Sequence, residues 1–117
     1  MAYAETQTIS VTTATGGGAT GYSSVVSGRV QQITYTKDTV ASTTDITITT
    51  ETTGQSVWAE SNVNATKTVN PLTAGDLESG AASSLTEVPI YAVNERVKVV
   101  IAQGGNTKAG TFRLIVT

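Results

Sequence analysis

The chain contains neither cysteine nor histidine. Without cysteine there is no disulfide, no thiolate nucleophile and no cysteine-ligated zinc or iron–sulfur site. Without histidine the chain lacks the commonest general base, the commonest metal ligand and the base of a serine–histidine pair. These absences exclude most hydrolytic mechanisms. We therefore expect the protein not to be an enzyme and to hold no cofactor or metal.

Charge is scarce as well, since 14% of the residues are charged, against about 25% in an ordinary soluble domain. The net charge of −2 opposes binding to nucleic acid, where affinity comes from many lysine and arginine contacts with phosphates. The charges are unevenly distributed. All nine acids lie at or before Glu95, whereas four of the seven basic residues lie from Arg96 onward. The C-terminal end is therefore basic and the rest of the chain acidic.

Long apolar stretches are also missing. The longest fully aliphatic run covers residues 99–102, far short of the roughly 20 residues that span a membrane. The first residues, Met-Ala-Tyr-Ala-Glu, show neither the basic nor the apolar region of a signal peptide. We expect a chain that is made as a soluble protein and has no membrane partner.

Threonine is abundant, with 23 copies among 117 residues. Because its side chain is β-branched and polar, threonine suits the solvent face of a strand. A surface rich in threonine and poor in charge loses little free energy on desolvation, which suits a protein packed against neighbours. The length is that of one domain.

Apolar and polar residues alternate in short stretches that predict β-strands. Residues 6–13 form the first such stretch, and residues 28–37 form the second. In the second stretch the apolar parity changes between Val30 and Ile33, which predicts a bulge near Gln31 or Gln32. Residues 45–50 and 56–60, separated by a turn with Gly54, predict a hairpin.

The C-terminal region carries the clearest alternation, and we interpret it as a second hairpin whose loop covers residues 103–110. Its outward face would be basic. Such a face is commonly just solvated, and it could also meet an acidic partner or an adjacent copy. The apolar residues are Val97, Val99, Ile101, Phe112, Leu114 and Val116, and the basic ones are Arg96, Lys98, Lys108 and Arg113.

Residues 61–87 lose the alternation, so we expect a long loop that contacts a partner. The pattern Thr73-x-x-Asp76 could begin one short helical turn. A short strand is expected at 88–92, interrupted or preceded by Pro89. Six or seven short strands predict an all-β fold, an antiparallel β-sandwich or a jelly-roll-like barrel.

Gly16, Gly18 and Gly21 match the dinucleotide-binding spacing G-x-G-x-x-G. That motif needs a helix directly after the loop, and none fits before the next strand begins near Gly28. We therefore interpret the glycines as a flexible link. Residues 1–20 would be an N-terminal strand and link, and 21–117 the β-domain. We hypothesise that residues 2–13 act as an assembly arm.

Other candidate sites have ordinary explanations. The sequon at Asn64 is best explained by chance, and Asp76 and Glu78 lack the further ligands of a calcium site. The acids Asp45, Glu51 and Glu60 resemble solubilising charges at strand ends rather than a catalytic pair. Among the aromatic residues, we expect Trp58, Tyr35 and Tyr91 to be core or half-buried, whereas Tyr3 and Tyr22 flank the arm and suit an interface.

Several segments resemble small structural proteins of tailed bacteriophages. They are "GYSSVVSGRVQQITY", "DITITTETTGQSVWAESNVNATKT" and "ERVKVVIAQGGNTKAGTFRLIVT", which cover most of the chain from Gly21 onward. The resemblance implies a virion component, a head decoration or cement protein on the capsid exterior, often a homotrimer. Its partners would be the major capsid protein and copies of itself, and it would be made in the host cytoplasm.

The mechanism we expect is added interface, in which many copies each bridge neighbouring capsid subunits and stabilise the shell. A rival hypothesis is a tail- or fibre-associated domain that binds host glycans by stacking Trp58 or Tyr22 on a sugar. For the decoration role, the expected contact residues are Tyr3, Ile9, Tyr22, Asn70, Leu72, Leu77, Arg96, Lys98 and Arg113.

Overall fold

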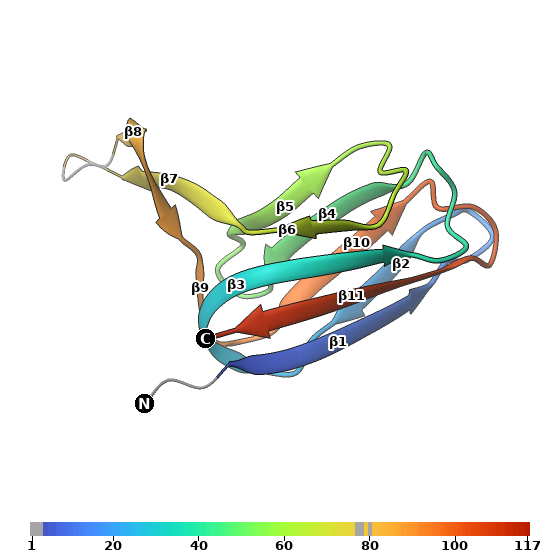
Figure 1. Cartoon of the computed structure of the whole chain (residues 1–117), viewed down its shortest axis with the longest axis horizontal. Coiled ribbons are helices and arrows are strands. Elements are labelled where there is room, and N and C mark those ends of the chain that lie inside the picture. Colours follow the sequence, from blue (N-terminus) through green and yellow to red (C-terminus); the bar gives the residue numbers. More distant parts are fainter. Residues whose placement is uncertain (1–3, 77–78, 80) are drawn as a thin grey trace.

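Alternating apolar side chains form two curled antiparallel sheets that enclose the core between them (Figure 1). The structure is a computed structural model and describes residues 4–76, 79 and 81–117. The prediction of an all-β, sandwich-like fold is confirmed. The strands are β1 (Glu5–Thr12), β2 (Ala19–Tyr22), β3 (Val26–Lys37), β4 (Asp45–Thr50), β5 (Ser56–Glu60), β6 (Lys67–Val69), β7 (Leu72–Asp76), β8 (Ala82–Pro89), β9 (Tyr91–Glu95), β10 (Val97–Ala102) and β11 (Ala109–Val116).

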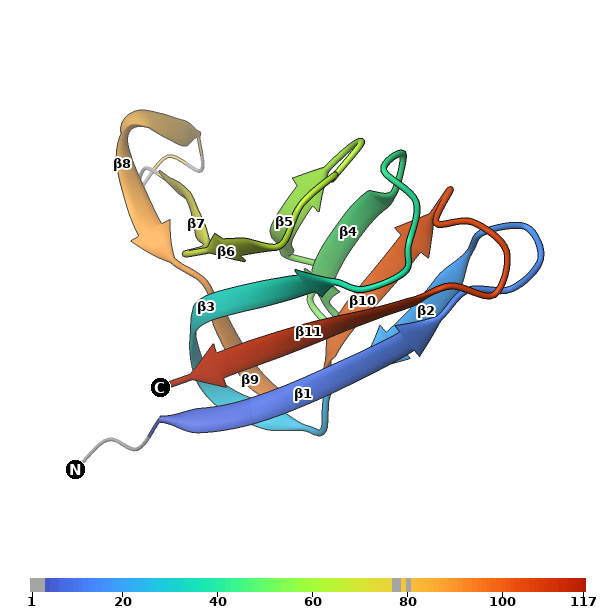
Figure 2. The same ribbon diagram turned by 45° about the vertical axis from the view of Figure 1, so that its right-hand side comes forward.

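The strands are divided between the two sheets and a separate hairpin. Sheet A has the order β1-β11-β3, and both β6 and β9 pair with β3. Sheet B has the order β2-β10-β4-β5. The strands β7 and β8 pair only with each other and project from the body as a hairpin (Figures 1 and 2). The described residues form eleven strands rather than the expected six or seven, because several strands are too short to show as an alternating pattern.

Three aromatic rings from both sheets meet in the centre of the core. The ring of Tyr35 stacks on Phe112 with 5.0 Å between centroids and lies 6.2 Å from the ring of Trp58. Inward-facing aliphatic side chains fill the rest. The largest fully buried ones are Ile33, Ile46, Ile48, Ile90, Ile101, Leu114, Val30, Val40, Val97 and Val99.

The hydroxyl of Tyr35 is buried without a hydrogen-bond partner among the described residues, and burial raises the pKa of this phenol. A buried hydroxyl without a partner has lost its bonds to water and gained none. We therefore expect Tyr35→Phe to raise the free energy of unfolding by about 1 kcal/mol in urea denaturation. A loss of stability would contradict this expectation and indicate a buried water bound to the hydroxyl.

Two local predictions are confirmed by the strand register. In the ladder between β3 and β11, Ile115 pairs with Gln32 and Val116 with Val30, so Gln31 is the extra residue of a bulge. The strands β4 and β5 form the expected hairpin, with Ile48 opposite Trp58.

The predicted C-terminal hairpin is wrong, because β10 and β11 lie in different sheets. The strand β10 pairs with β2 and β4, whereas β11 pairs with β1 and β3. Two consecutive strands with apolar inner faces fit a hairpin and also fit two strands that face each other across a core. As a consequence, Lys98 points outward from sheet B and Arg113 from sheet A, and the expected single basic face does not exist.

The N-terminal strand forms the edge of sheet A and is docked on the domain rather than projecting as an arm. All of β1 pairs with β11, and the side chains of Ile9 and Val11 are buried. The glycine-rich link is held by backbone hydrogen bonds, among them the amide of Gly104 to the carbonyl of Gly17 at 2.9 Å. Alternation places two large apolar residues on the inner side of the strand, and their burial favours this docked position.

The region expected as a long loop, residues 61–87, instead contains β6, β7 and most of β8. Thr73 and Asp76 both lie in β7, so the predicted helical turn is wrong. The hairpin interrupts one edge of β3. Val69 in β6 pairs with Ile33, and the carbonyl of Ile90 accepts a hydrogen bond from the amide of Val30, three residues along β3. The β7–β8 hairpin is thus an excursion from the strand position beside β3.

Candidate functional site

Large hydrophobic side chains that remain exposed gather along one edge of the molecule. Such clusters mark surfaces that contact other molecules, whereas single exposed apolar residues are ordinary. They come from the end of β2, the connection to β3, the base of the hairpin and β9. Among the described residues they are Tyr22 (40% exposed), Val25 (57%), Leu72 (47%), Tyr91 (54%) and Val93 (70%), which together we call the apolar edge.

The alternation of side chains along β8 and β9 determines which residues form the first part of the apolar edge. Ile90, between β8 and β9, is fully buried, so its neighbours Pro89 and Tyr91 face the other way. Leu72 pairs with Pro89 at the base of the hairpin, which sets it beside Tyr91 along the same side. Val93 follows two residues later in β9.

A bulge in β9 follows Val93 and turns Glu95 inward. Between the pairs Gly28–Ala92 and Val26–Glu95, β9 has two residues opposite the single residue Ser27. One of the two, Asn94, has a φ of 52°, and its amide donates to the hydroxyl of Ser27 at 2.9 Å. The extra residue lets both Ala92 and Glu95 point into the molecule although they are three positions apart.

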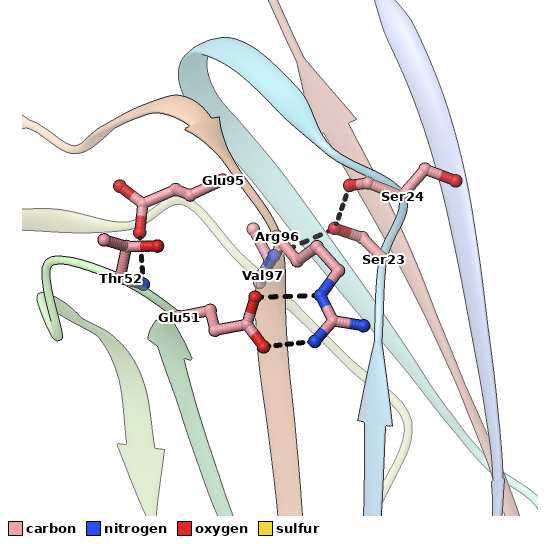
Figure 3. A network of polar contacts seen from close by, with 7 residues as sticks. All are labelled: Ser23, Ser24, Glu51, Thr52, Glu95, Arg96 and Val97. Atoms are coloured by element: carbon pink, nitrogen blue, oxygen red, sulfur yellow. Dashed lines mark hydrogen bonds and ion pairs between the residues drawn. The ribbon is translucent and has the colours of Figure 1, made fainter.

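Glu95 anchors this end of β9 from inside. Its carboxylate is 4% exposed and accepts hydrogen bonds from the amides of Thr52 (2.8 Å) and Thr53 (3.1 Å) and from the hydroxyl of Thr53 (3.0 Å). Burial raises the pKa of Glu95, but the hydrogen bonds from Thr53 and Thr52 outweigh it, so the pKa lies below its usual value. The carboxylate thereby ties β9 to the turn between β4 and β5 (Figure 3).

Arg96 orders the other end of the apolar edge. Its guanidinium binds both carboxylate oxygens of Glu51, with 2.8 Å from Nε to Oε1, and lies 4.0 Å from the centroid of the Tyr22 ring (Figure 3 shows the ion pair). The hydrogen bond from Arg96 lowers the pKa of Glu51. Beside it, the hydroxyl of Ser23 accepts from the amide of Val97 at 2.9 Å. These contacts hold the exposed ring of Tyr22 in one orientation.

The expected contact residues are divided by the fold. Tyr22 and Leu72 belong to the apolar edge, and Lys98 adjoins it because it pairs with Tyr22 between β10 and β2. Asn70 lies at the hairpin base, where its Oδ1 accepts from Gln32. Arg96 lies over the ring of Tyr22 at the same end of the edge. By contrast, Ile9 is buried in the core and Arg113 lies on the outer face of sheet A. Tyr3 and Leu77 fall outside the described residues.

Three members of the apolar edge were not expected there. No sequence pattern singled out Val25 or Val93 as a contact residue, and Tyr91 was expected to be core or half-buried. A usable signal exists in the chain around β9, where Ile90 and Ala92 have the inward parity that leaves Tyr91 and Val93 outward. The bulge at Asn94 hides the continuation of this pattern to Glu95.

The other candidate sites serve structural roles. Trp58 is 7% exposed and donates to Glu60, so its ring is not available for stacking on a sugar. The carboxylate of Glu60 also pairs with Lys67, and Asp45 accepts from the amide of Asn62. Glu78 falls outside the described residues. Over residues 4–76, 79 and 81–117, no group of three metal-ligating side chains occurs and no helix could cross a membrane.

Comparisons with known proteins add little. No protein family matches the chain, and no curated protein matches it either. A solved structure with partial likeness is an exo-beta-1,3-galactanase from Phanerochaete chrysosporium, with galactose, at 16% identity and a TM-score of 0.36. The likeness covers 100% of this chain, which spans 30% of the length of the galactanase chain. At this TM-score it carries no argument about function.

Proposed function

We propose that the protein is a bacteriophage virion component that decorates the capsid exterior and stabilises the shell. The observation that carries the proposal is the apolar edge, where five large hydrophobic side chains stay exposed along β9 and the segments that adjoin it. Exposed clusters with aromatic members and little charge are typical of surfaces that bind protein. The threonine-rich outer strands and the resemblance of the sequence to phage structural proteins support the same role.

The stabilising mechanism follows from mass action. A protein that binds only the assembled shell lowers the free energy of that state, and many copies add their contributions. The rigid framework under the apolar edge helps because Glu95 and Arg96 already fix β9 and Tyr22 before binding. Less side-chain freedom is then lost when the edge meets a partner.

Copy number is the first test of this proposal. Quantitative mass spectrometry of purified particles is expected to find about one chain per major capsid subunit, or one trimer per few subunits, because a decoration protein must repeat with the shell. A handful of copies per particle would contradict the capsid role. That result would favour the tail-associated glycan-binding alternative, for which Tyr22 and Tyr91 are exposed aromatic residues in the part of the chain that the structure describes.

A further inference from the structure

We propose that the apolar edge binds the apolar edge of a second copy of this chain, with the hairpin of one copy against the Arg96–Lys98 end of the other. The inference rests on the proposed function only in treating this edge as a protein-contact surface. It requires no capsid. The contact is specified by three features of the edge, namely its apolar length, its two charged ends and its unsupported hairpin.

The apolar length follows the chain from the hairpin to β10. Leu72 lies at the hairpin base, Tyr91 and Val93 follow along β9, and Val25 lies next to Val26, which pairs with Glu95. The edge ends at Tyr22 under the guanidinium of Arg96. A strip of this kind can be covered along its whole length by an identical strip in the opposite direction.

The two ends of the edge carry opposite charge. On the hairpin, Glu87 of β8 is exposed and lies opposite Ala74 of β7, and the sequence has no lysine or arginine between Lys67 and Arg96. At the other end Arg96 is neutralised by Glu51, whereas Lys98 has no ion pair among the described residues.

This distribution makes the edge complementary to itself. When two copies face each other antiparallel, the acidic hairpin of each lies near Lys98 of the other, and both contacts are attractive. A parallel arrangement would instead place hairpin against hairpin and Lys98 against Lys98. The contact is therefore isologous, and it closes as a two-fold pair of chains.

The hairpin itself needs outside support. Its two strands pair only with each other, and they project from the body in both views (Figures 1 and 2). An isolated two-stranded hairpin is marginally stable in water and becomes stable when it packs on another surface. A second copy whose edge receives the hairpin supplies that surface.

The test measures self-association of the full chain by sedimentation velocity over a range of concentrations. Wild type is expected to self-associate, and Val93→Asp is expected to be monomeric up to roughly 100 µM because it puts a charge in the middle of the apolar contact. Since Val93 is 70% exposed, the melting temperature of Val93→Asp should equal that of wild type at a concentration where both are monomeric. The matched control Thr8→Asp, at an exposed position on sheet A, should associate like wild type.

A charge exchange tests the orientation. Glu87→Lys and Lys98→Glu are each expected to weaken association about tenfold at low salt, and the double variant should return to within about threefold of wild type. The proposal would be overturned if wild type is monomeric or if Val93→Asp associates like wild type. It would also be overturned if the double variant loses as much association affinity as the two single variants added together. Capsid binding by a monomeric wild type would reject this inference and keep the proposed function, whereas self-association without capsid binding would do the reverse.

Discussion

Replacing Gly21 by alanine is expected to lower the free energy of unfolding by about 3 kcal/mol, a large part of the stability of a domain of this size. A Cβ atom at this position would lie 2.7 Å from Cγ2 of Ile9 and 2.7 Å from Cγ1 of Val11. Both methyl groups are buried, and both belong to β1, which is held along its length by β11. Neither strand can withdraw without losing core contacts.

The matched control comes from the same glycine cluster. At Gly16 an added Cβ would have no other atom within 4 Å, and φ is not positive, so Gly16→Ala should leave stability within about 0.5 kcal/mol of wild type. Urea denaturation of both variants checks the pair. Equal effects would contradict the close approach of β2 to β1, and a large loss at Gly16 alone would indicate that the link has a role beyond connection.

Replacing Glu95 by alanine is expected to cost about 3 kcal/mol of folding stability, because the amides of Thr52 and Thr53 and a hydroxyl lose a charged acceptor. Glu95→Gln keeps the shape but offers one acceptor oxygen, so an intermediate loss is expected. Glu5→Ala is the control, since Glu5 is exposed on β1. Indistinguishable melting curves for Glu95→Ala and Glu5→Ala would refute this role for the buried carboxylate.

The free energy of unfolding should also depend on pH through the carboxylate of Glu95. The pKa of Glu95 is lower in the folded protein than its usual 4.5, so the unfolded chain binds the proton more tightly. Its stabilising contribution is therefore complete above pH 4.5 and is lost as the pH falls through the folded pKa. The pKa values of Glu51 and Glu60 are lowered too, by hydrogen bonds from Arg96 and Lys67, but solvent screens these exposed pairs. Between about pH 5 and 3, stability should fall less steeply in Glu95→Ala than in wild type.

Local strand features were predictable because they depend on neighbours in sequence. The parity change after Val30 located the bulge at Gln31, and the turn at Gly54 located the β4–β5 hairpin. Sheet membership was not predictable, because the alternation in β10 and β11 is the same whether they share a sheet or face each other. Gly21 matched a dinucleotide-binding spacing, but glycine is required there because β2 approaches Ile9 of β1 closely. This contact joins strands that are distant in sequence, so the sequence pattern could not show it.

The candidate site was predictable only in part. Tyr22 and Leu72 were expected as contact residues because they stood outside clear strands, and both remain exposed. Val93 was missed because a valine in a strand usually faces the core, and because the bulge at Asn94, in the left-handed region, breaks the alternation that would have shown Val93 to point outward. The acceptor role of Glu95 was invisible, since its partners lie more than 40 residues away.

The hairpin also makes this chain a scaffold for displaying foreign peptides. Val69 and Ile90 are held beside positions of β3 that are three residues apart, a gap of about 10 Å that a few residues can span. The chain between them can therefore be shortened to a tight turn or exchanged for an unrelated epitope while the strands on either side keep their partners. On a particle that carried many copies, each inserted peptide would be presented outward from the body in the same orientation.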